Sequence, residues 1–206
     1  LIATREAVAS RVVLTTGTFL RGLMHTGPHS TPGGSVGEAP SNALSDELAE
    51  LGFRMGRFNT GTPPRLARSS VELYRFVEQP GDDRPTFFSV ATSAVRLPLV
   101  ACHIAHTNFD VQAVVMQNLE RSPMFNVTIQ VRGPRYCPSL EDKVYRFNDR
   151  EAHTLYIEPE GLESDLFYLN GFSTSMPDDV QLRMLHAVKG LEDCEMVRPG
   201  YAVEYD

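Results

Sequence analysis

Several features that define other classes of protein are missing from this 206-residue sequence. Its three cysteines, Cys102, Cys137 and Cys194, form no C-x-x-C pair. An odd number of unclustered cysteines argues against a disulfide scaffold or a cysteine zinc site, and it indicates a reducing compartment. No apolar run approaches the ~18 residues of a membrane helix, so we expect no membrane span. The first residues lack the basic and apolar regions of a signal peptide, and we expect the chain to be part of a longer protein.

A bulk basic surface is also missing, because the formal net charge is −7. That charge leaves room for a local basic groove. Four arginines lie close together in the sequence, namely Arg54, Arg57, Arg65 and Arg68. We interpret them first as a solvated face, with a tRNA- or partner-binding groove as the alternative.

What the sequence does contain is an ordinary globular composition, with 42% apolar and 22% charged residues. Its length fits one domain, or one domain with an insertion. "RVVLTTGTF" (11–19) predicts a buried parallel strand, and residues 27–41 predict an irregular loop rich in Gly and Pro. Ser41 follows as the predicted cap of a helix that ends at Gly52.

The rest of the chain mixes both kinds of element. Residues 53–58 predict a short strand, 59–66 predict a rigid Gly-Pro loop, and Ser69 with Glu72 predicts a helical capping box. The other predicted elements are helices at 109–120 and from Pro177 to Gly190, and strands at 126–131, 154–159 and 165–170. Together these elements predict an α/β sheet domain with a middle region inserted into it.

The segment "RGPRYCPSLEDK" carries the sharpest candidate for catalysis, Cys137. Ser139 and Asp142 fit a capping box, which places Cys137 two residues before a helix N-terminus. The partial positive charge of that terminus stabilises a thiolate, and Arg132 and Arg135 add to it. The alternative is a buried structural cysteine, and the spacing alone leaves both open.

The other candidates are weaker. We interpret the remaining two cysteines as structural. His103 and His106 form an H-x-x-H pair without an acidic ligand at a suitable spacing, so we predict no metal site. His25 and His29 flank a glycine loop, where contact with a ligand would be unspecific.

A glycine-rich loop that follows a strand and ends at a helix N-terminus presents backbone N–H groups to phosphates. "TPGGSVGEAPS" meets that description, with Ser41 at the mouth of the helix. No G-x-G-x-x-G fingerprint occurs anywhere in the chain. The loop by itself is therefore weak evidence for a nucleotide site.

Long motifs nevertheless resemble one family throughout the chain from Val12 onward. They are "VVLTTGTFLRG", "GGSVGEAPS", "NTGTPPR", "RSPMF", "GPRYCPSLEDKVYRF", "EPEGL", "NGFSTSMPDDVQ" and "VRPGYAVEYD". Their content and order resemble the MnmG/GidA family of tRNA uridine-5-carboxymethylaminomethyl modification enzymes, with wording closest to the mitochondrial branch. The resemblance implies part of a glutathione-reductase-like, FAD-binding Rossmann domain with an inserted α+β domain. Residues 1–66 would belong to the FAD-binding domain, 67–130 to the insertion, and 131–206 to the rest of the insertion and the return.

The family resemblance also implies an activity. It is a flavin-dependent tRNA modification that adds a carboxymethylaminomethyl-type or taurinomethyl-type group at C5 of the wobble uridine. FAD and NADH would be the cofactors, and the partners would be tRNA, a GTPase and a second copy in a homodimer. The implied location is the mitochondrial matrix, with the bacterial cytoplasm as the alternative. We expect this segment to be inactive alone, because the FAD fingerprint, the other catalytic cysteine and the GTPase-binding helical domain lie outside it.

The matching motifs imply roles for two single residues and for one continuous block of residues. Ser41 matches a serine that contacts FAD, and Cys137 matches one of two cysteines that the family needs for activity. The predicted NAD-binding block consists of Gly133, Pro134, Arg135, Tyr136, Cys137, Pro138, Ser139, Leu140, Glu141, Asp142, Lys143, Val144, Tyr145, Arg146 and Phe147.

The sequence departs from the family pattern at three positions. Ser35 replaces an Arg, Asn59 replaces a Lys, and Leu169 replaces a Pro. The loss of two cations near the cofactor loops is expected to weaken contacts with phosphate or tRNA, or to mark a divergent lineage. Two other functions remain open, a folate-dependent tRNA (uracil-5-)-methyltransferase flavoprotein and a non-catalytic tRNA- or partner-binding module.

Overall fold

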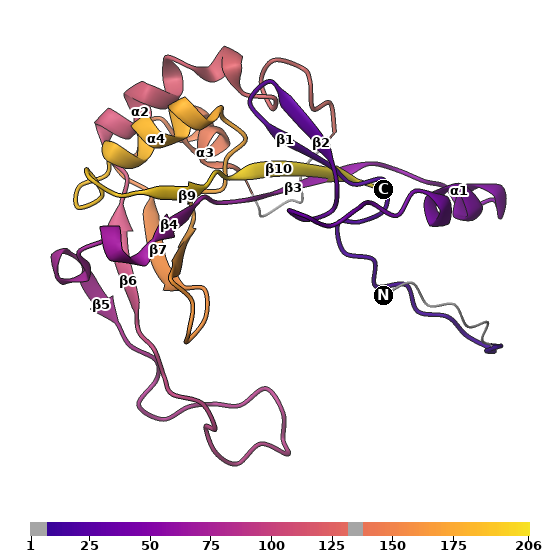
Figure 1. Cartoon of the computed structure of the whole chain (residues 1–206), viewed down its shortest axis with the longest axis horizontal. Helices are drawn as coiled ribbons and strands as arrows, with labels where there is room; N and C mark the ends of the chain where they lie inside the picture. Colours follow the sequence, from indigo (N-terminus) through magenta and orange to yellow (C-terminus); the bar gives the residue numbers. More distant parts are fainter. Residues whose placement is uncertain (1–7, 132–137) are drawn as a thin grey trace.

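Two antiparallel sheets organise the chain in a computed structural model that describes residues 8–131 and 138–206 (Figure 1). The small sheet has the order β2-β1-β10-β3. Its strands are β1 (Leu23–Thr26), β2 (His29–Pro32), β3 (Phe58–Thr62) and β10 (Tyr201–Tyr205). The large sheet has the order β5-β6-β7-β8-β4-β9. Its strands are β4 (Arg65–Ala67), β5 (Val77–Gln79), β6 (Cys102–His106), β7 (Thr154–Pro159), β8 (Leu166–Asn170) and β9 (Met196–Arg198). The predicted mixture of helices and strands is confirmed.

One two-stranded ribbon runs through both sheets. β3 continues into β4 and β9 into β10, so β3 pairs with β10 in one sheet and β4 with β9 in the other. Pro63, Pro64 and Pro199 interrupt the ladder between the sheets, because proline has no N–H to donate. A Cβ atom at Gly200 would lie 2.7 Å from the carbonyl oxygen of Thr62, so the crossing needs glycine there.

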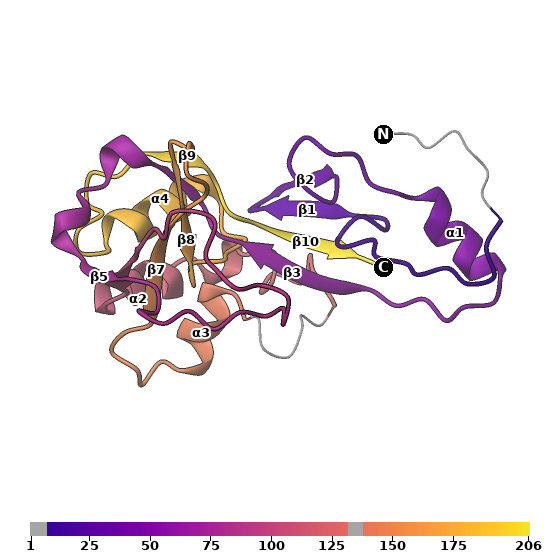
Figure 2. The ribbon, with the colours of Figure 1, turned by 90° about the horizontal axis from the view of Figure 1, so that it is seen from below.

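Three helices pack on the large sheet and a fourth lies apart. α2 (Phe109–Met116), α3 (Leu140–Arg146) and α4 (Asp178–His186) share a core with β4, β7 and β8. The largest fully buried side chains there include Leu66, Leu155, Ile157, Phe167, Leu169, Phe172, Met176 and Met184. α1 (Ala43–Glu50) lies at the far end of the small sheet (Figure 2). The core therefore sits at one end of the molecule and α1 at the other.

Several predictions that rest on local signals are confirmed. α2 begins at Asn108, whose side chain accepts a hydrogen bond from the Val111 N–H at 3.0 Å. α3 begins as its capping box predicts, with Ser139 Oγ accepting from the Asp142 N–H at 3.2 Å. α4 and the antiparallel pair β7–β8 form where periodicity predicts them. Gly52, at φ +88°, ends α1 in the left-handed region that favours glycine.

The prediction of a buried parallel strand at 11–19 is wrong. This segment forms no strand, Val12 and Val13 are 78% and 83% exposed, and every pairing between the named strands is antiparallel. An apolar run becomes a strand only where a neighbour pairs with its backbone N–H and C=O groups. The predicted strand at 126–131 is wrong for the same reason.

Two predicted loops, one predicted strand and one predicted helix are also corrected. The predicted loop at 27–41 contains β2, which pairs with β1 through a turn at Gly27. The predicted loop at 59–66 contains most of β3 and the start of β4, and the strand predicted at 53–58 begins only at its last residue. Ser69 and Glu72 cap no α-helix, since two 3-10 turns form over 68–70 and 73–75.

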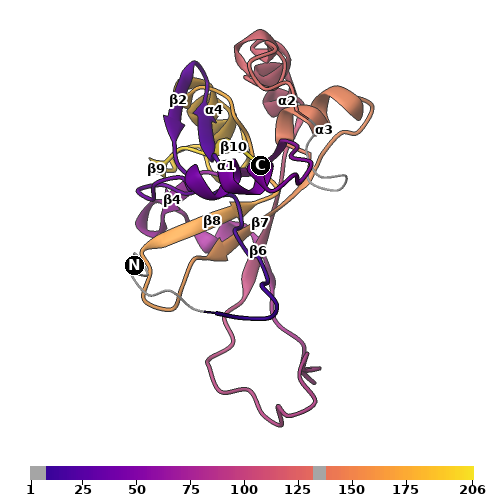
Figure 3. The same ribbon diagram turned by 90° about the vertical axis from the view of Figure 1, so that its right-hand side faces the viewer.

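A long arm projects from the large sheet. Residues 80–101 join β5 to β6 without regular structure and extend away from both sheets (Figure 3). Phe88 and Val90 on this arm are fully exposed. Within the described residues, no helix is long and apolar enough to cross a membrane.

Candidate functional site

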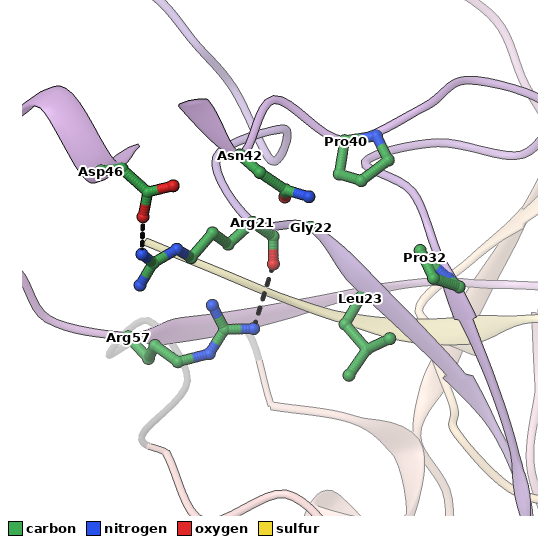
Figure 4. A pocket seen from close by; sticks show the side chains of 8 residues that line it. All are labelled: Arg21, Gly22, Leu23, Pro32, Pro40, Asn42, Asp46 and Arg57. Atoms are coloured by element: carbon green, nitrogen blue, oxygen red, sulfur yellow. Dashed lines mark hydrogen bonds and ion pairs between the residues drawn. The ribbon is translucent and has the colours of Figure 1, made fainter. Parts of the chain in front are cut away.

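An open pocket of about 520 Å³ lies between α1 and the small sheet. Its lining residues come from four separate segments, at 21–23, 32, 40–46 and 57 (Figure 4). They are Arg21, Gly22, Leu23, Pro32, Pro40, Asn42, Asp46 and Arg57. Two arginines, one carboxylate and the first residues of a helix therefore surround one space.

Ser41 lies directly between two of these lining residues, Pro40 and Asn42. Its backbone N–H donates to the Phe19 carbonyl at 2.8 Å, and its carbonyl accepts from the Arg21 N–H at 3.2 Å. These bonds fix the glycine loop to the segment that leads into β1. Ser41 does not cap α1 as predicted, because Asn42 is the N-cap and makes no side-chain capping bond.

Close backbone packing explains the glycines beside the pocket. The Gly33 N–H donates to the Gly22 carbonyl at 2.9 Å. A Cβ atom at Gly22 would lie 2.6 Å from the Gly33 carbonyl oxygen, and one at Gly34 would lie 2.6 Å from the Phe19 ring. Ser35, which departs from the family pattern, forms a tight bridge with Glu38 in the next turn. The loop is thus a compact backbone cradle with few side chains.

Charged groups at the pocket are connected through Asp206. The Asp206 carboxylate is only 4% exposed and accepts from Arg57 Nη1 at 2.7 Å and from the Ser45 hydroxyl. Arg21 Nε lies 3.6 Å from the same carboxylate, and Arg21 Nη2 pairs with Asp46. Arg57 Nη2 also donates to the Arg21 carbonyl at 3.2 Å. The two guanidinium groups therefore lie side by side over one buried carboxylate.

A second polar chain crosses the small sheet beside the pocket. His25 Nε2 lies 2.8 Å from Glu204 Oε2, and Ser30 Oγ lies 2.9 Å from His25 Nδ1. His25 and Glu204 are both buried. Because both ring nitrogens of His25 bond to protein atoms, this histidine ties β2, β1 and β10 together.

The predicted NAD-binding block is described only from Pro138 onward. Gly133–Cys137, including the candidate nucleophile Cys137, lie outside the described residues. In α3, Leu140, Glu141 and Val144 are buried in the core. Three other members of the block, Tyr145, Arg146 and Phe147, are exposed.

Glu141 anchors the start of α3 inside the protein. Its Oε1 accepts from the Ser175 N–H and the Ser175 hydroxyl, both at 3.0 Å, and from Ser122 Oγ at 3.2 Å. Its other oxygen, Oε2, is buried and has no hydrogen-bond partner among residues 8–131 and 138–206. Lys143 Nζ donates to the Gly171 carbonyl at 3.0 Å. These contacts hold the helix that follows Cys137 against the loop between β8 and α4.

The four clustered arginines do not form one groove. Arg57 belongs to the pocket, whereas Arg65 pairs with Glu160 at 2.6 Å and lies over the Tyr168 ring on the large sheet. Arg68 lies over Phe167 on the same sheet.

The other two positions that depart from the family pattern both lie inside the protein. The buried Asn59 donates to the Val131 carbonyl at 3.0 Å, and Leu169 is a fully buried core residue. Both therefore have packing roles within this chain.

The two described cysteines have the environments of structural residues. Burial raises the pKa of the Cys194 thiol to about 12, and burial followed by the charge of Glu158 raises the pKa of Cys102. His103 and His106 lie three residues apart on a strand, which places them on opposite faces of the sheet. Among the described residues, no group of three or more His, Cys, Asp or Glu side chains could hold a metal ion.

Sequence reasoning missed Arg21, Asp46 and Asp206 as members of a site. Arg21 and Asp206 belong to two different family motifs, and no single motif brings members of the site together, since 149 positions separate Arg57 from Asp206. Only the nearby loop with Ser41 carried a signal. Its order, a glycine-rich stretch followed by a helix, indicated the right region.

Comparison with known proteins adds an independent finding. The family model described as glucose inhibited division protein A matches residues 2–206. The tRNA uridine 5-carboxymethylaminomethyl modification enzyme MnmG of Syntrophotalea carbinolica is 52% identical over 195 residues, which cover 95% of this chain and 32% of that protein. The MnmG of Rhodopirellula baltica is 50% identical over 198 residues, with coverages of 96% and 30%.

Solved structures agree with these sequence relatives. Aquifex aeolicus GidA in its form I crystal matches with a TM-score of 0.79 and 40% identity. The match covers 93% of this chain and 33% of that one. The form II crystal gives a TM-score of 0.78. The chain thus spans about a third of the length of the proteins that it matches.

Proposed function

Because the chain belongs to the glucose inhibited division protein A family, we propose that it forms part of an FAD-dependent enzyme that modifies tRNA. The modification is the addition of a carboxymethylaminomethyl-type or taurinomethyl-type group at C5 of the wobble uridine. NADH is the reductant, a GTPase is the partner, and the full-length enzyme is a homodimer. The names of the two MnmG relatives reported above support the reaction class.

One observation of the molecule carries the cofactor assignment. Ser41, the residue that matches an FAD-contacting serine, stands in the chain between Pro40 and Asn42, and both of these line a pocket that also contains two arginines and the start of α1. Gly22, Gly33 and Gly34 are required by close packing within the chain itself, and this packing keeps the loop compact beside the pocket. The residues present therefore fit FAD. When bound, the flavin would supply the electron transfer.

The chain's own residues would position the nucleotides and the reacting cysteine. The backbone around Ser41 would bind FAD, and the exposed side chains of α3 would be available to NADH. Cys137 would act as nucleophile or general acid-base group near uridine C5 or C6. Glu141 and the Ser139 cap fix the helix that follows it. We keep the division into 1–66, 67–130 and 131–206 as a proposal.

Replacement of Cys137 in the full-length protein tests this function. The Cys137→Ser variant is expected to retain FAD and to lose wobble-uridine modification, measured by mass spectrometry of nucleosides from complemented cells. Cys102→Ser is the matched control, because Cys102 lies in β6. Modification at the wild-type rate in Cys137→Ser would remove Cys137 from the mechanism. Loss of 5-methyluridine at another position, with the wobble base unchanged, would favour the folate-dependent methyltransferase.

The location of the enzyme is part of the same proposal. The relatives reported above are bacterial proteins, which favours the bacterial cytoplasm over the mitochondrial matrix. Fractionation of the source cells, followed by immunodetection of the full-length protein, distinguishes the two.

A further inference from the structure

Two positive and two negative side chains meet at the pocket, and they differ in how accessible they are. Arg57 Nη1 donates to the buried Asp206 carboxylate at 2.7 Å, and Arg57 Nη2 donates to the Arg21 carbonyl at 3.2 Å. Arg21 Nε lies 3.6 Å from the same carboxylate, and Arg21 Nη2 pairs with Asp46. Asp206 is only 4% exposed, whereas the side chains of Arg21 and Asp46 are 49% and 54% exposed. The accessible part of the pocket therefore presents guanidinium groups and one carboxylate side by side (Figure 4).

We propose that this pocket binds the amine donor of the proposed reaction, a small amino acid or aminosulfonic acid. Arg21 and Arg57 bind its acid group, and Asp46 binds its ammonium group. This inference rests on the proposed function and names the chemical class of the small substrate that the pocket takes.

The chemistry of the added group defines the donor. The names of the two MnmG relatives refer to a carboxymethylaminomethyl group, in which the nitrogen carries a methylene carboxylate. That nitrogen and its substituent have the skeleton of glycine. In a taurinomethyl group, the nitrogen carries an ethylene sulfonate, which is the skeleton of taurine. Both donors are therefore primary amines with a nearby acid group, and both are zwitterions at neutral pH.

The charges of the pocket match a zwitterion. A guanidinium group donates in a planar fork that matches acid oxygens, and charge-assisted bonds of this kind are strong. An exposed ion pair contributes little to stability, so a ligand that bonds to both Arg21 and Asp46 can separate them at small cost. The two arginines, Asp46 and Asp206 together carry no net charge. The pocket therefore offers a partner to each end of a zwitterion, and it has no excess positive charge to attract a multivalent anion.

The position of the pocket also suits a donor that acts next to a flavin. Ser41, the predicted FAD contact, stands between the lining residues Pro40 and Asn42. The Arg21 N–H donates to the Ser41 carbonyl at 3.2 Å, and Arg21 has φ +45°, in the left-handed region that non-glycine residues rarely adopt. Strained residues of this kind concentrate at ligand sites. A volume of about 520 Å³ accommodates a ligand of a few heavy atoms.

A purely structural role of these side chains predicts a different outcome. If the Arg21–Asp46 pair only joined α1 to the segment before β1, loss of either residue would change the affinity for all small ligands alike. If the two residues bind opposite ends of a zwitterion, each replacement affects only the ligands that carry the matching charge. The pattern of affinities across ligands therefore distinguishes the two roles.

The test uses the full-length protein with its flavin and measures weak binding by saturation-transfer NMR. The ligands are glycine, taurine, acetate, which has only the acid group, and methylamine, which has only the amine. Glycine or taurine is expected to bind more tightly than acetate and methylamine, and the tighter of the two identifies the group that is added. Arg21→Met should bind this donor and acetate roughly tenfold or more weakly, without weaker binding of methylamine. Asp46→Asn should bind the donor and methylamine roughly threefold to tenfold more weakly, without weaker binding of acetate.

Arg54→Met and Glu50→Gln are the matched controls, because both residues are exposed, lie near α1 and do not line the pocket. They should leave all four affinities unchanged. Arg57→Met is not used, because Arg57 also anchors the buried Asp206.

Two outcomes would overturn the inference and leave the proposed function intact. One is a wild-type protein that binds neither glycine nor taurine more tightly than acetate and methylamine. The other is an equal change for all four ligands in Arg21→Met or in Asp46→Asn. Failure of the full-length wild-type protein to bind FAD would instead overturn the proposed function.

Discussion

Replacement of Gln181 by Met should loosen the crossing between the two sheets. Gln181 is fully buried in α4, and its amide bonds to the backbone at the point where the ribbon changes sheets. Its Nε2 donates to the Gly200 carbonyl at 2.9 Å and to the Met176 carbonyl at 2.7 Å. Its Oε1 accepts from the Gly200 N–H at 2.7 Å. Methionine has a similar volume and makes none of these bonds.

The size of the effect follows from the three lost bonds. Each contributes a net ~0.5–1.5 kcal/mol, and a buried backbone group left without a partner costs about 1–3 kcal/mol. Partial relaxation around Met and some hydration keep the total below the sum of these costs. We expect about 3 kcal/mol, which corresponds to roughly a hundredfold change in a local opening equilibrium.

Hydrogen–deuterium exchange of the full-length protein, followed by mass spectrometry, measures this change directly. The amide of Gly200 and its neighbours in β10 should exchange roughly a hundredfold faster in Gln181→Met than in the wild-type protein. Gln117→Met, at the exposed C-terminal end of α2, is the matched control and should leave exchange at Gly200 unchanged. Exchange at Gly200 within a factor of ~3 of wild type would refute the assignment of the crossing to Gln181.

Three further predictions concern single side chains. Burial raises the pKa of the Cys194 thiol to about 12, so at pH 8 it should react with a disulfide reagent roughly a thousandfold more slowly than a free cysteine. Unfolding in urea should remove this difference, and rapid labelling of Cys194 in the native protein would contradict the prediction. Burial, and then the charges of Lys143 and Arg150, lowers the pKa of His153, so the unfolded chain binds a proton more readily. The stability of the protein should therefore fall as pH drops below ~6.5 towards the lowered native pKa of His153. The melting temperature of His153→Asn should fall less over this pH range than that of the wild-type protein. An equal fall in both proteins would exclude His153 as the cause. Leu155→Ala in the core should lower the free energy of unfolding, measured by chemical denaturation, by about 2–5 kcal/mol. The exposed Leu162→Ala should lower it by less than ~0.5 kcal/mol. Equal losses in the two variants would contradict the placement of the core.

Local signals in the sequence were sufficient for α2, α3 and α4 and for one hairpin, although the capping box at Ser69 and Glu72 produced only 3-10 turns. α3 begins where Ser139 and Asp142 predict, and α4 follows the spacing of Val180 and Met184. β7 and β8 are close in the sequence, so each strand finds its partner after a short turn. A capping bond or an apolar stripe is complete within a few residues, and nothing distant needs to supply it. The family was identified from long motifs for the same reason, since each is continuous in the sequence.

Distant partners decided the rest of the fold. The segment at 11–19 has a strand-like composition and forms no strand, whereas the Gly-Pro stretch at 59–66 contains parts of β3 and β4. β3 becomes a strand because β10, over 130 positions later, supplies the partners for its backbone groups. Strand formation depends on that neighbour more than on composition.

The pocket shows the same division between local and distant information. The sequence by itself determined that Ser41 ends a compact glycine loop before a helix, and it identified the family. Only the tertiary structure placed Arg21, Arg57 and Asp206 together, across separations of 36 and 149 positions. A charged side chain carries no mark of its partner in the sequence, because the partner is set by the register of β10 beside β1 and β3.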